Sequence, residues 1–161
     1  GVRDLGCCPS PFDSYLMTLG LETLSLRVRH EVESARRLAE YCRNHPKVER
    51  VSFVGFESHP SYANAKKYFR FGSSAVFTIE LKGTLDSTVR FVESLNLAAH
   101  MVMIGDSVTV VTHPASTTHK QLSDADLAAA GVTPTMLRIS VGLENTDDLI
   151  DDFEQAFAHI G

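Results

Sequence analysis

The stretch "SAVFTIELKGTLDSTVRFVESL", residues 74–95, joins a strand pattern directly to a helix pattern. Apolar residues alternate with mixed ones over 74–81, which predicts a strand with one buried face. That face would consist of Ala75, Phe77, Ile79 and Leu81. Thr84 is a typical N-cap for a helix over 84–95. The inward face of this helix would consist of Leu85, Val89, Val92 and Leu95. Two neighbouring elements with one apolar face each are expected to pack together.

The alternation of short strands and helices continues in both directions along the chain. Further strands are expected at 48–54, 107–112 and 136–141, and further helices at 58–69, 123–131 and 145–160. A long helical stretch precedes them. It begins with Ser10 as N-cap and Pro11, breaks near Gly20 and stops at "NHP", 44–46. Together these elements predict an α+β domain, a two-layer sandwich with a small, mainly antiparallel sheet and helices on one face.

Composition and charge exclude several classes of function. The 161 residues include 15 basic and 20 acidic ones, for a net charge of −5, so we expect no nucleic-acid partner and no membrane-binding face. No apolar run approaches the roughly 18 residues of a membrane span. The cysteines, Cys7, Cys8 and Cys42, are odd in number and lack metal-ligand spacing. Reduced thiols and a cytoplasmic location are therefore expected.

The loop "VVTHPASTTH", 110–119, is rich in side chains that could carry chemistry. His113 and His119 lie six positions apart, which is not a recognised metal-ligand spacing. Ser116 has histidines nearby as potential bases, but it lacks the G-x-S-x-G turn of a nucleophile elbow. Serine and threonine commonly hydrogen-bond their own backbone in such loops. The sequence therefore predicts neither a metal site nor a nucleophile here.

One arginine, Arg138, stands inside the apolar strand pattern "MLRISV", 136–141. An arginine on a half-exposed sheet commonly faces solvent and does nothing more. Alternatively, its planar guanidinium can hold a carboxylate through two hydrogen bonds, with the strand fixing its position. The strand pattern alone leaves both interpretations open.

Five segments, in their order and spacing, resemble the C-terminal portion of the pyridoxal-phosphate (PLP) enzymes of Cys/Met metabolism. They are "SPFDSYLMTLGLETLSLRVRHEVESA", "FESHPSYANAKKYF", "IGDSVTVVTHPASTTHKQLS", "AGVTPTMLRISVGLEN" and "DDLIDDFEQA". Within the family, "HPASTTH" is most similar to the O-acetylhomoserine sulfhydrylases (O-acetylhomoserine aminocarboxypropyltransferases). The resemblance implies the C-terminal domain of a fold-type I PLP enzyme. Residues 1–20 would be the end of a large PLP domain and the start of the connecting helix, and 21–161 would be the domain that binds the substrate carboxylate.

The resemblance also implies an activity. Such a transferase replaces the acetate of O-acetylhomoserine by sulfide, which gives homocysteine for methionine biosynthesis, and PLP serves as the electron sink. The cofactor lysine, in a Ser/Thr-x-Lys pattern, would precede residue 1, so no catalytic or cofactor-binding residue is assigned here. Because the chain lacks an initiator methionine, we expect a piece of a longer protein that is inactive alone. Its implied partners are the amino-acid substrate, sulfide, its own large domain and the sister subunits of a homotetramer.

Three residues take site roles from the resemblance. Arg138 of "LRISVGLE" would bind the substrate carboxylate. Met103 occupies a position, two before "GD", where relatives have Ser or Asn near that carboxylate. Methionine offers no comparable side-chain hydrogen bond, so only the backbone of Met103 could serve. Ser116 belongs to the stretch that lines the entrance to the active site in relatives. It would act indirectly, by positioning residues that contact the substrate.

Two alternatives stay open at this point. The longer protein could be a methionine γ-lyase or a cystathionine-type lyase, although methionine γ-lyases tend to have Met where this chain has Thr117. In a different class, the chain could be a stand-alone interaction module without catalysis.

Overall fold

The structure, a computed structural model, describes the backbone of residues 2–160 and the side chains of residues 4–123 and 125–160. Within this part of the chain, strands form one sheet in the order β1-β2-β5-β4-β3. Their bounds are β1 (Val48–Ser52), β2 (Val76–Leu81), β5 (Met136–Ser140), β4 (Val110–Thr112) and β3 (Ala99–His100). The first four in that order pair antiparallel, and β3 pairs parallel with β4. The predicted small, mainly antiparallel sheet is confirmed.

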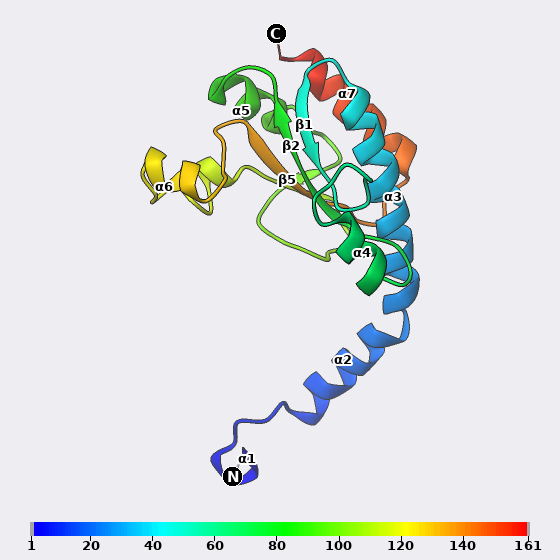
Figure 1. The fold of residues 1–161 in the computed structure, drawn as a ribbon. Helices are drawn as coiled ribbons and strands as arrows, with labels where there is room; N and C mark the ends of the chain where they lie inside the picture. The colour runs from blue at the N-terminus through cyan, green and yellow to red at the C-terminus, as the bar shows by residue number, and fades with distance from the viewer. Residues whose placement is uncertain (1, 161) are drawn as a thin grey trace.

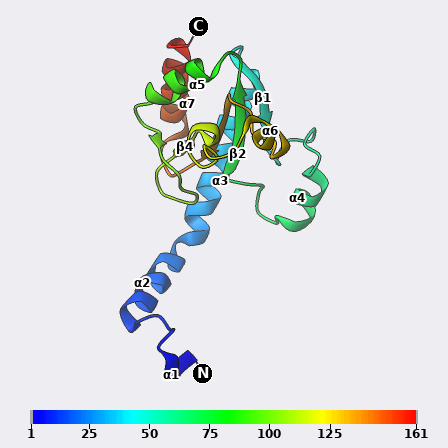
Figure 2. The ribbon, with the colours of Figure 1, turned by 90° about the vertical axis from the view of Figure 1, so that its left-hand side faces the viewer.

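Helices form the second layer, chiefly those at 24–44, 85–93 and 146–158. Their bounds are α1 (Val2–Leu5), α2 (Pro11–Glu22), α3 (Leu24–Asn44), α4 (Tyr62–Tyr68), α5 (Leu85–Glu93), α6 (Asp124–Ala129) and α7 (Thr146–Ala158), with a 3-10 turn at Pro114–Ser116. Figures 1 and 2 show α3 and α7 side by side behind the sheet, whereas α1 and α2 project from it as an arm. The two-layer α+β class with helices on one face is therefore confirmed.

The core lies between the sheet and the helices α3, α5 and α7. On β2 and β5, every second side chain points into it. The ring of Phe91 on α5 lies 4.6 Å from that of Phe157 on α7, centroid to centroid. Burying such aromatic side chains dominates core energetics. The main contributors, each at most 2% exposed, are Leu38, Ala39, Cys42, Phe77, Ile79, Leu81, Phe91, Leu137, Ile139, Phe153 and Phe157.

The alternate residues of the strands face away from these helices, and they make up the open face of the sheet. Arg138 on β5 lies opposite Thr78 on β2 and opposite Thr112 on β4. Ser52 on β1 lies opposite Thr78. A row of polar side chains, Ser52, Thr78, Arg138 and Thr112, therefore crosses the open face. Strand β5 is hydrogen-bonded on both edges, so Arg138 stands on one of the inner strands of the sheet.

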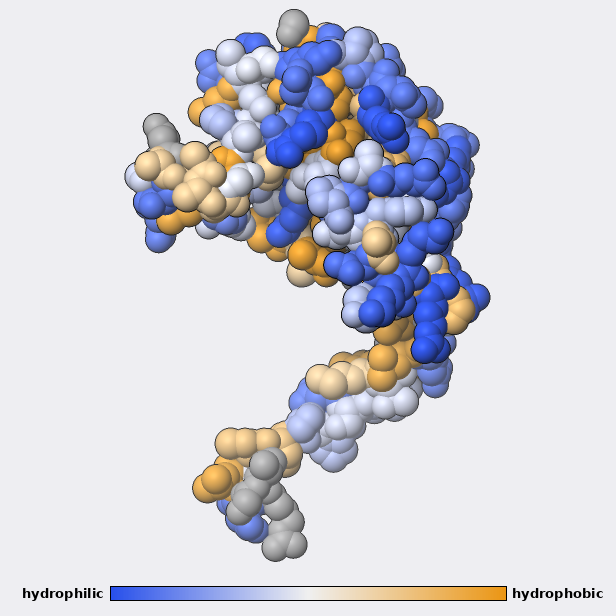
Figure 3. All heavy atoms as spheres, viewed as in Figure 1, coloured by the Kyte–Doolittle hydropathy of each residue, from blue (hydrophilic) through white to orange (hydrophobic). Residues whose placement is uncertain are grey.

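The structure corrects two details of the long helical stretch. Ser10 does cap α2, since its side chain accepts from the Asp13 amide. However, α2 continues through Gly20, and the break falls at Thr23. Helix α3 also extends beyond the sheet, which leaves Leu24 and Val28 each 41% exposed. No residue of α2 is buried, and Figure 3 shows hydrophobic residues along much of the arm.

The inward face predicted for α5 was wrong in part. Leu85 is 44% exposed, whereas Thr88 and Phe91 are fully buried. Thr88 can be buried because its hydroxyl donates to the Thr84 carbonyl at 3.0 Å, which satisfies its polar group. Thr84 itself is the predicted N-cap.

Other predicted bounds were too long. The strands expected at 48–54, 74–81, 107–112 and 136–141 are shorter in the structure, as are the helices expected at 58–69, 123–131 and 145–160. In the described part of the chain, no helix is long and apolar enough to cross a membrane. Position 1 of the predicted segment 1–20 lies outside the described residues.

Candidate functional site

The guanidinium of Arg138 is one charged group of the open face, where Arg50 on β1 and Glu80 on β2 also form an ion pair. Its Nη2 donates to the Thr112 hydroxyl at 3.2 Å and to the Met103 carbonyl at 3.4 Å. Its Nε is buried and has no hydrogen-bond partner among the described residues. A buried donor without a partner costs about 1–3 kcal/mol, so the guanidinium retains unused capacity to bind an acceptor.

That capacity suits a carboxylate in a specific way. A guanidinium offers two planar forks to a carboxylate, Nε with Nη2 and Nη1 with Nη2. Both forks include Nη2, which already donates to Thr112 and Met103. A bidentate ligand must therefore share or replace one of these two bonds. The contact to the Met103 carbonyl, at 3.4 Å, is the longer one and the easier to replace.

Thr112 couples the arginine to the loop at 101–108. Its hydroxyl donates to the Met101 carbonyl at 2.6 Å and accepts from Arg138. Met103 in the same loop presents its carbonyl to Arg138, while its side chain is 46% exposed. The structure thus brings together two of the predicted site residues, Arg138 and the backbone of Met103.

A second set of contacts fixes the end of this loop to the segment after β5. The Glu144 carboxylate accepts from the Thr109 amide at 2.6 Å and from the Thr109 hydroxyl at 2.7 Å. The Thr109 hydroxyl accepts from the Gly142 amide at 2.9 Å. A Cβ on Gly142 would lie 2.5 Å from the carbonyl oxygen of Ser107, so the close approach of the two backbones requires glycine.

Ser116, the third predicted site residue, does not join this group. Its hydroxyl hydrogen-bonds Nδ1 of His113 at 2.8 Å, and Nε2 of His113 lies 2.9 Å from the Pro134 carbonyl. Because a carbonyl can only accept, Nε2 carries the ring proton and Nδ1 accepts from Ser116. His113 is 1% exposed, and a backbone carbonyl stands where a catalytic triad has a carboxylate. The pair ties the 3-10 turn to the start of β5 and does not form a nucleophile.

The residues around Arg138 also bear on metal and cofactor binding. In the described part of the chain, no three His, Cys, Asp or Glu side chains gather as metal ligands. The row that flanks Arg138 across the sheet contains no lysine. Lys120 follows Thr118 in a Ser/Thr-x-Lys spacing, but it is an exposed residue of the loop after the 3-10 turn. The residues around Arg138 therefore do not form a PLP site by themselves.

The loop at 101–108, which contacts Arg138 through the Met103 carbonyl, also exposes apolar side chains. The loop that carries the Met103 carbonyl exposes large apolar side chains, namely Met101, Val102, Met103, Ile104 and Val108. A guanidinium with unused donors beside exposed apolar side chains is a composition that suits a small organic acid.

Comparisons with known proteins identify the family of the chain. The family model of the Cys/Met metabolism PLP-dependent enzymes matches residues 2–158. The chain is 46% identical to a homocysteine synthase of Schizosaccharomyces pombe over 96% of its length. It is 43% identical to O-acetyl-L-homoserine sulfhydrylase 1 of Thermus thermophilus over 98%. It spans only 36% and 38% of these two relatives.

A solved structure shares the fold at similar identity. It is a putative O-acetylhomoserine (thiol)-lyase from Campylobacter jejuni that contains N'-pyridoxyl-lysine-5'-monophosphate. The TM-score is 0.87 with 36% identity, covering 98% of this chain and 37% of that one.

Proposed function

This chain belongs to the Cys/Met metabolism PLP-dependent enzymes, and from that premise we propose that it is the substrate-carboxylate-binding part of an O-acetylhomoserine sulfhydrylase. In the proposed reaction, sulfide replaces the acetate of O-acetylhomoserine and homocysteine is formed. Relatives that carry the sulfhydrylase and homocysteine synthase names support this choice over the lyases and over a non-catalytic module.

The observation that carries the proposal is the state of Arg138. Its Nε is buried and has no partner in the described part of the chain, and its strand is paired along both edges. A fixed cation with unused donors can orient an amino-acid substrate by its carboxylate, which lowers the entropic part of the barrier. The Met103 carbonyl cannot donate to a carboxylate, so it would only occupy the Arg138 guanidinium until the substrate carboxylate replaces it. Ser116 would act indirectly, by anchoring the turn next to β5.

PLP, when bound, supplies the electron sink for such a replacement. We assign its binding to the part of the protein that lies outside this chain, because no lysine stands beside Arg138. The division into 1–20 and 21–161 belongs to the same proposal. It is supported by the arm of α1 and α2, which packs none of the residues of α2 into the core. We further propose that the full-length enzyme is a homotetramer in the cytoplasm.

The test is a product assay on the full-length protein loaded with PLP. With O-acetylhomoserine and sulfide, we expect homocysteine and acetate in equal amounts. Release of an α-keto acid at a rate that sulfide does not change would identify a γ-lyase and overturn the proposal. Absence of both products would favour the non-catalytic module.

A further inference from the structure

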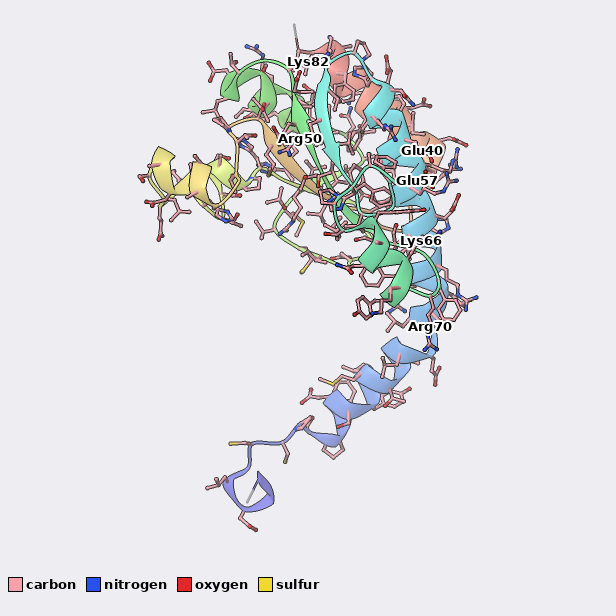
Figure 4. The ribbon with its side chains drawn as sticks, viewed as in Figure 1. Glu40, Arg50, Glu57, Lys66, Arg70 and Lys82 are labelled. Atoms are coloured by element: carbon pink, nitrogen blue, oxygen red, sulfur yellow. The ribbon has the colours of Figure 1, made fainter. Side chains whose placement is uncertain are left out.

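A cavity of about 460 Å³ lies between α3, α4 and the segment 69–73 that follows α4. Its volume is within the range of small-molecule sites, about 300–1,000 Å³. It shares no residue with the neighbourhood of Arg138. Figure 4 shows two of its residues, Lys66 on α4 and Arg70 just after α4, both on the side of α3. Its lining includes three cationic and three aromatic side chains, namely Arg29, Lys66, Arg70, Tyr62, Phe69 and Phe71.

The cavity carries an excess of positive charge. One of its cations, Arg36, is neutralised by Glu33 at 2.7 Å and Glu40 at 2.8 Å. Three others, Arg29, Lys66 and Arg70, have no carboxylate partner among the described residues. In a chain with a net charge of −5, three such cations around one hollow form a local anion-attracting field.

Aromatic rings accompany these cations. The guanidinium of Arg29 lies 5.2 Å from the ring centroid of Phe71, and the ammonium of Lys66 lies 5.6 Å from that of Tyr62. Phe69 and Phe71 are 51% and 77% exposed, so both rings offer open surface, in Phe71 on the side away from Arg29. Exposed aromatic faces can stack on a flat base, and arginine adds a cation–π contribution.

We propose that this cavity binds a nucleoside phosphate. The base stacks on the aromatic side chains, and the phosphates accept hydrogen bonds from Arg29, Lys66 and Arg70. Arginine and lysine are the usual phosphate-binding side chains, arginine as a planar fork and lysine as a point charge. The inference does not depend on the proposed sulfhydrylase activity, because the two sites have no residue in common.

The experiment is calorimetric titration of the full-length protein with ADP. Arg70→Glu and Lys66→Glu are expected to weaken ADP binding by at least about tenfold, because each reverses a charge at the phosphates. The matched control is Lys82→Glu, which makes the same charge change at an exposed lysine outside the cavity and should alter Kd by less than about twofold. Adenosine lacks both phosphates, and ribose 5-phosphate lacks the base and the second phosphate, so each should bind at least about tenfold more weakly than ADP.

Several results would overturn the inference. They are the absence of ADP binding, equal effects of Arg70→Glu and Lys82→Glu, or ribose 5-phosphate binding as tightly as ADP. Should Arg70→Glu fail to fold, Arg70→Gln removes the charge with less disturbance and makes the same test. The homocysteine assay, run on the same preparations, separates the two proposals, since either can fail while the other stands.

Discussion

Arg138 on β5 and Thr112 on β4 lie directly opposite each other, and the guanidinium donates to the threonine hydroxyl at 3.2 Å. The same hydroxyl donates to the Met101 carbonyl at 2.6 Å. One small side chain therefore links the arginine to the loop at 101–108. The position of the positive charge and the path of that loop depend on each other.

Replacing the arginine tests the proposed carboxylate site. Arg138→Ala should lower kcat/KM of the full-length enzyme for O-acetylhomoserine by about ten- to a hundredfold or more, since a charged hydrogen bond contributes roughly 1.5–3 kcal/mol. Arg138→Lys should also be impaired, because an ammonium cannot reproduce the fork. Steady-state kinetics measure both, and an unchanged kcat/KM for Arg138→Ala would rule out the assignment.

The hydroxyl of Thr112 can be removed with little change of shape. Thr112→Val leaves Nη2 of Arg138 without its nearer acceptor, so we expect a loss of roughly 1–2 kcal/mol in substrate binding and a rise in KM of about five- to thirtyfold. Thr78→Val is the matched control, because Thr78 flanks Arg138 on the other side without a hydrogen bond to it. Equal KM values for the two variants would contradict the coupling.

Asp152 on α7 holds the segment before β3. Its carboxylate accepts from the backbone amides of Asn96, Leu97 and Ala98 at 2.8–3.0 Å, and it is 6% exposed. Asp152→Ala should reduce the free energy of unfolding by roughly 3 kcal/mol or more, since several donors lose a charged acceptor. Asp151→Ala, at the exposed neighbouring position, should change it by less than about 0.5 kcal/mol. Urea titration measures the free energy of unfolding of both variants. Equal decreases would show that the contacts of Asp152 to the three amides do not stabilise the fold.

His45 makes stability depend on pH. Its ring stacks on Phe157 at 3.9 Å, and its Nδ1 accepts from the Lys47 amide, which requires an unprotonated Nδ1. Burial lowers the pKa of His45, and the charge of Lys47 lowers it further, while Glu154 opposes both. The unfolded chain therefore binds more protons than the folded one, so stability should fall as pH drops below about 6.5.

Urea titrations between about pH 7.5 and 5.5 measure this slope. His45→Gln should flatten it, whereas His159→Gln, at an exposed histidine, should leave it as it is. The prediction fails if the slope of His45→Gln matches that of the unmodified protein.

Cys42 should resist thiol reagents in the native state. It is 0% exposed, and burial raises the pKa of its thiol, so the reactive thiolate is suppressed. Cys7 and Cys8 are exposed in the structure. Iodoacetamide followed by peptide mass spectrometry should find Cys42 unmodified natively and modified in urea. Native modification of Cys42 as fast as that of Cys7 would contradict the packing of α3.

Local patterns predicted the sheet and the main helices because period and capping are properties of neighbouring residues. The alternation around Phe77 and Ile79, the cap at Ser10 and the cap at Thr84 illustrate this. The two-residue strand β3 was missed, since so short a pairing leaves no periodic pattern. Leu85 was placed inward because apolar spacing ignores that Thr88 satisfies its hydroxyl within the helix.

The candidate site was predictable only in part, and for a physical reason. The arginine in the apolar strand was visible, but the strand pattern could not choose between a solvent-facing and a ligand-binding side chain. Its partners Thr112 and Met103 are 26 and 35 positions away in the chain. The contact between Thr109 and Glu144 likewise spans 35 positions. The register of β4 against β5, together with the paths of the loops next to these strands, brings such residues together, and local spacing encodes neither.

The pairing of β5 on both edges has a consequence for how the site adapts. The backbone at Arg138 can move only if the hydrogen bonds of β5 to β2 and to β4 break together. The backbone amide protons of β5 should therefore exchange with solvent only on cooperative unfolding. The residues at 101–108 are mostly exposed, and they are held by isolated hydrogen bonds at Met101, Met103, Gly105 and Ser107 and not by a continuous ladder. At the proposed site, an incoming carboxylate would therefore meet a cation on a fixed strand and a loop that can move more easily. Mutations in that loop, and not in β5, should therefore change which substrate lengths the enzyme accepts.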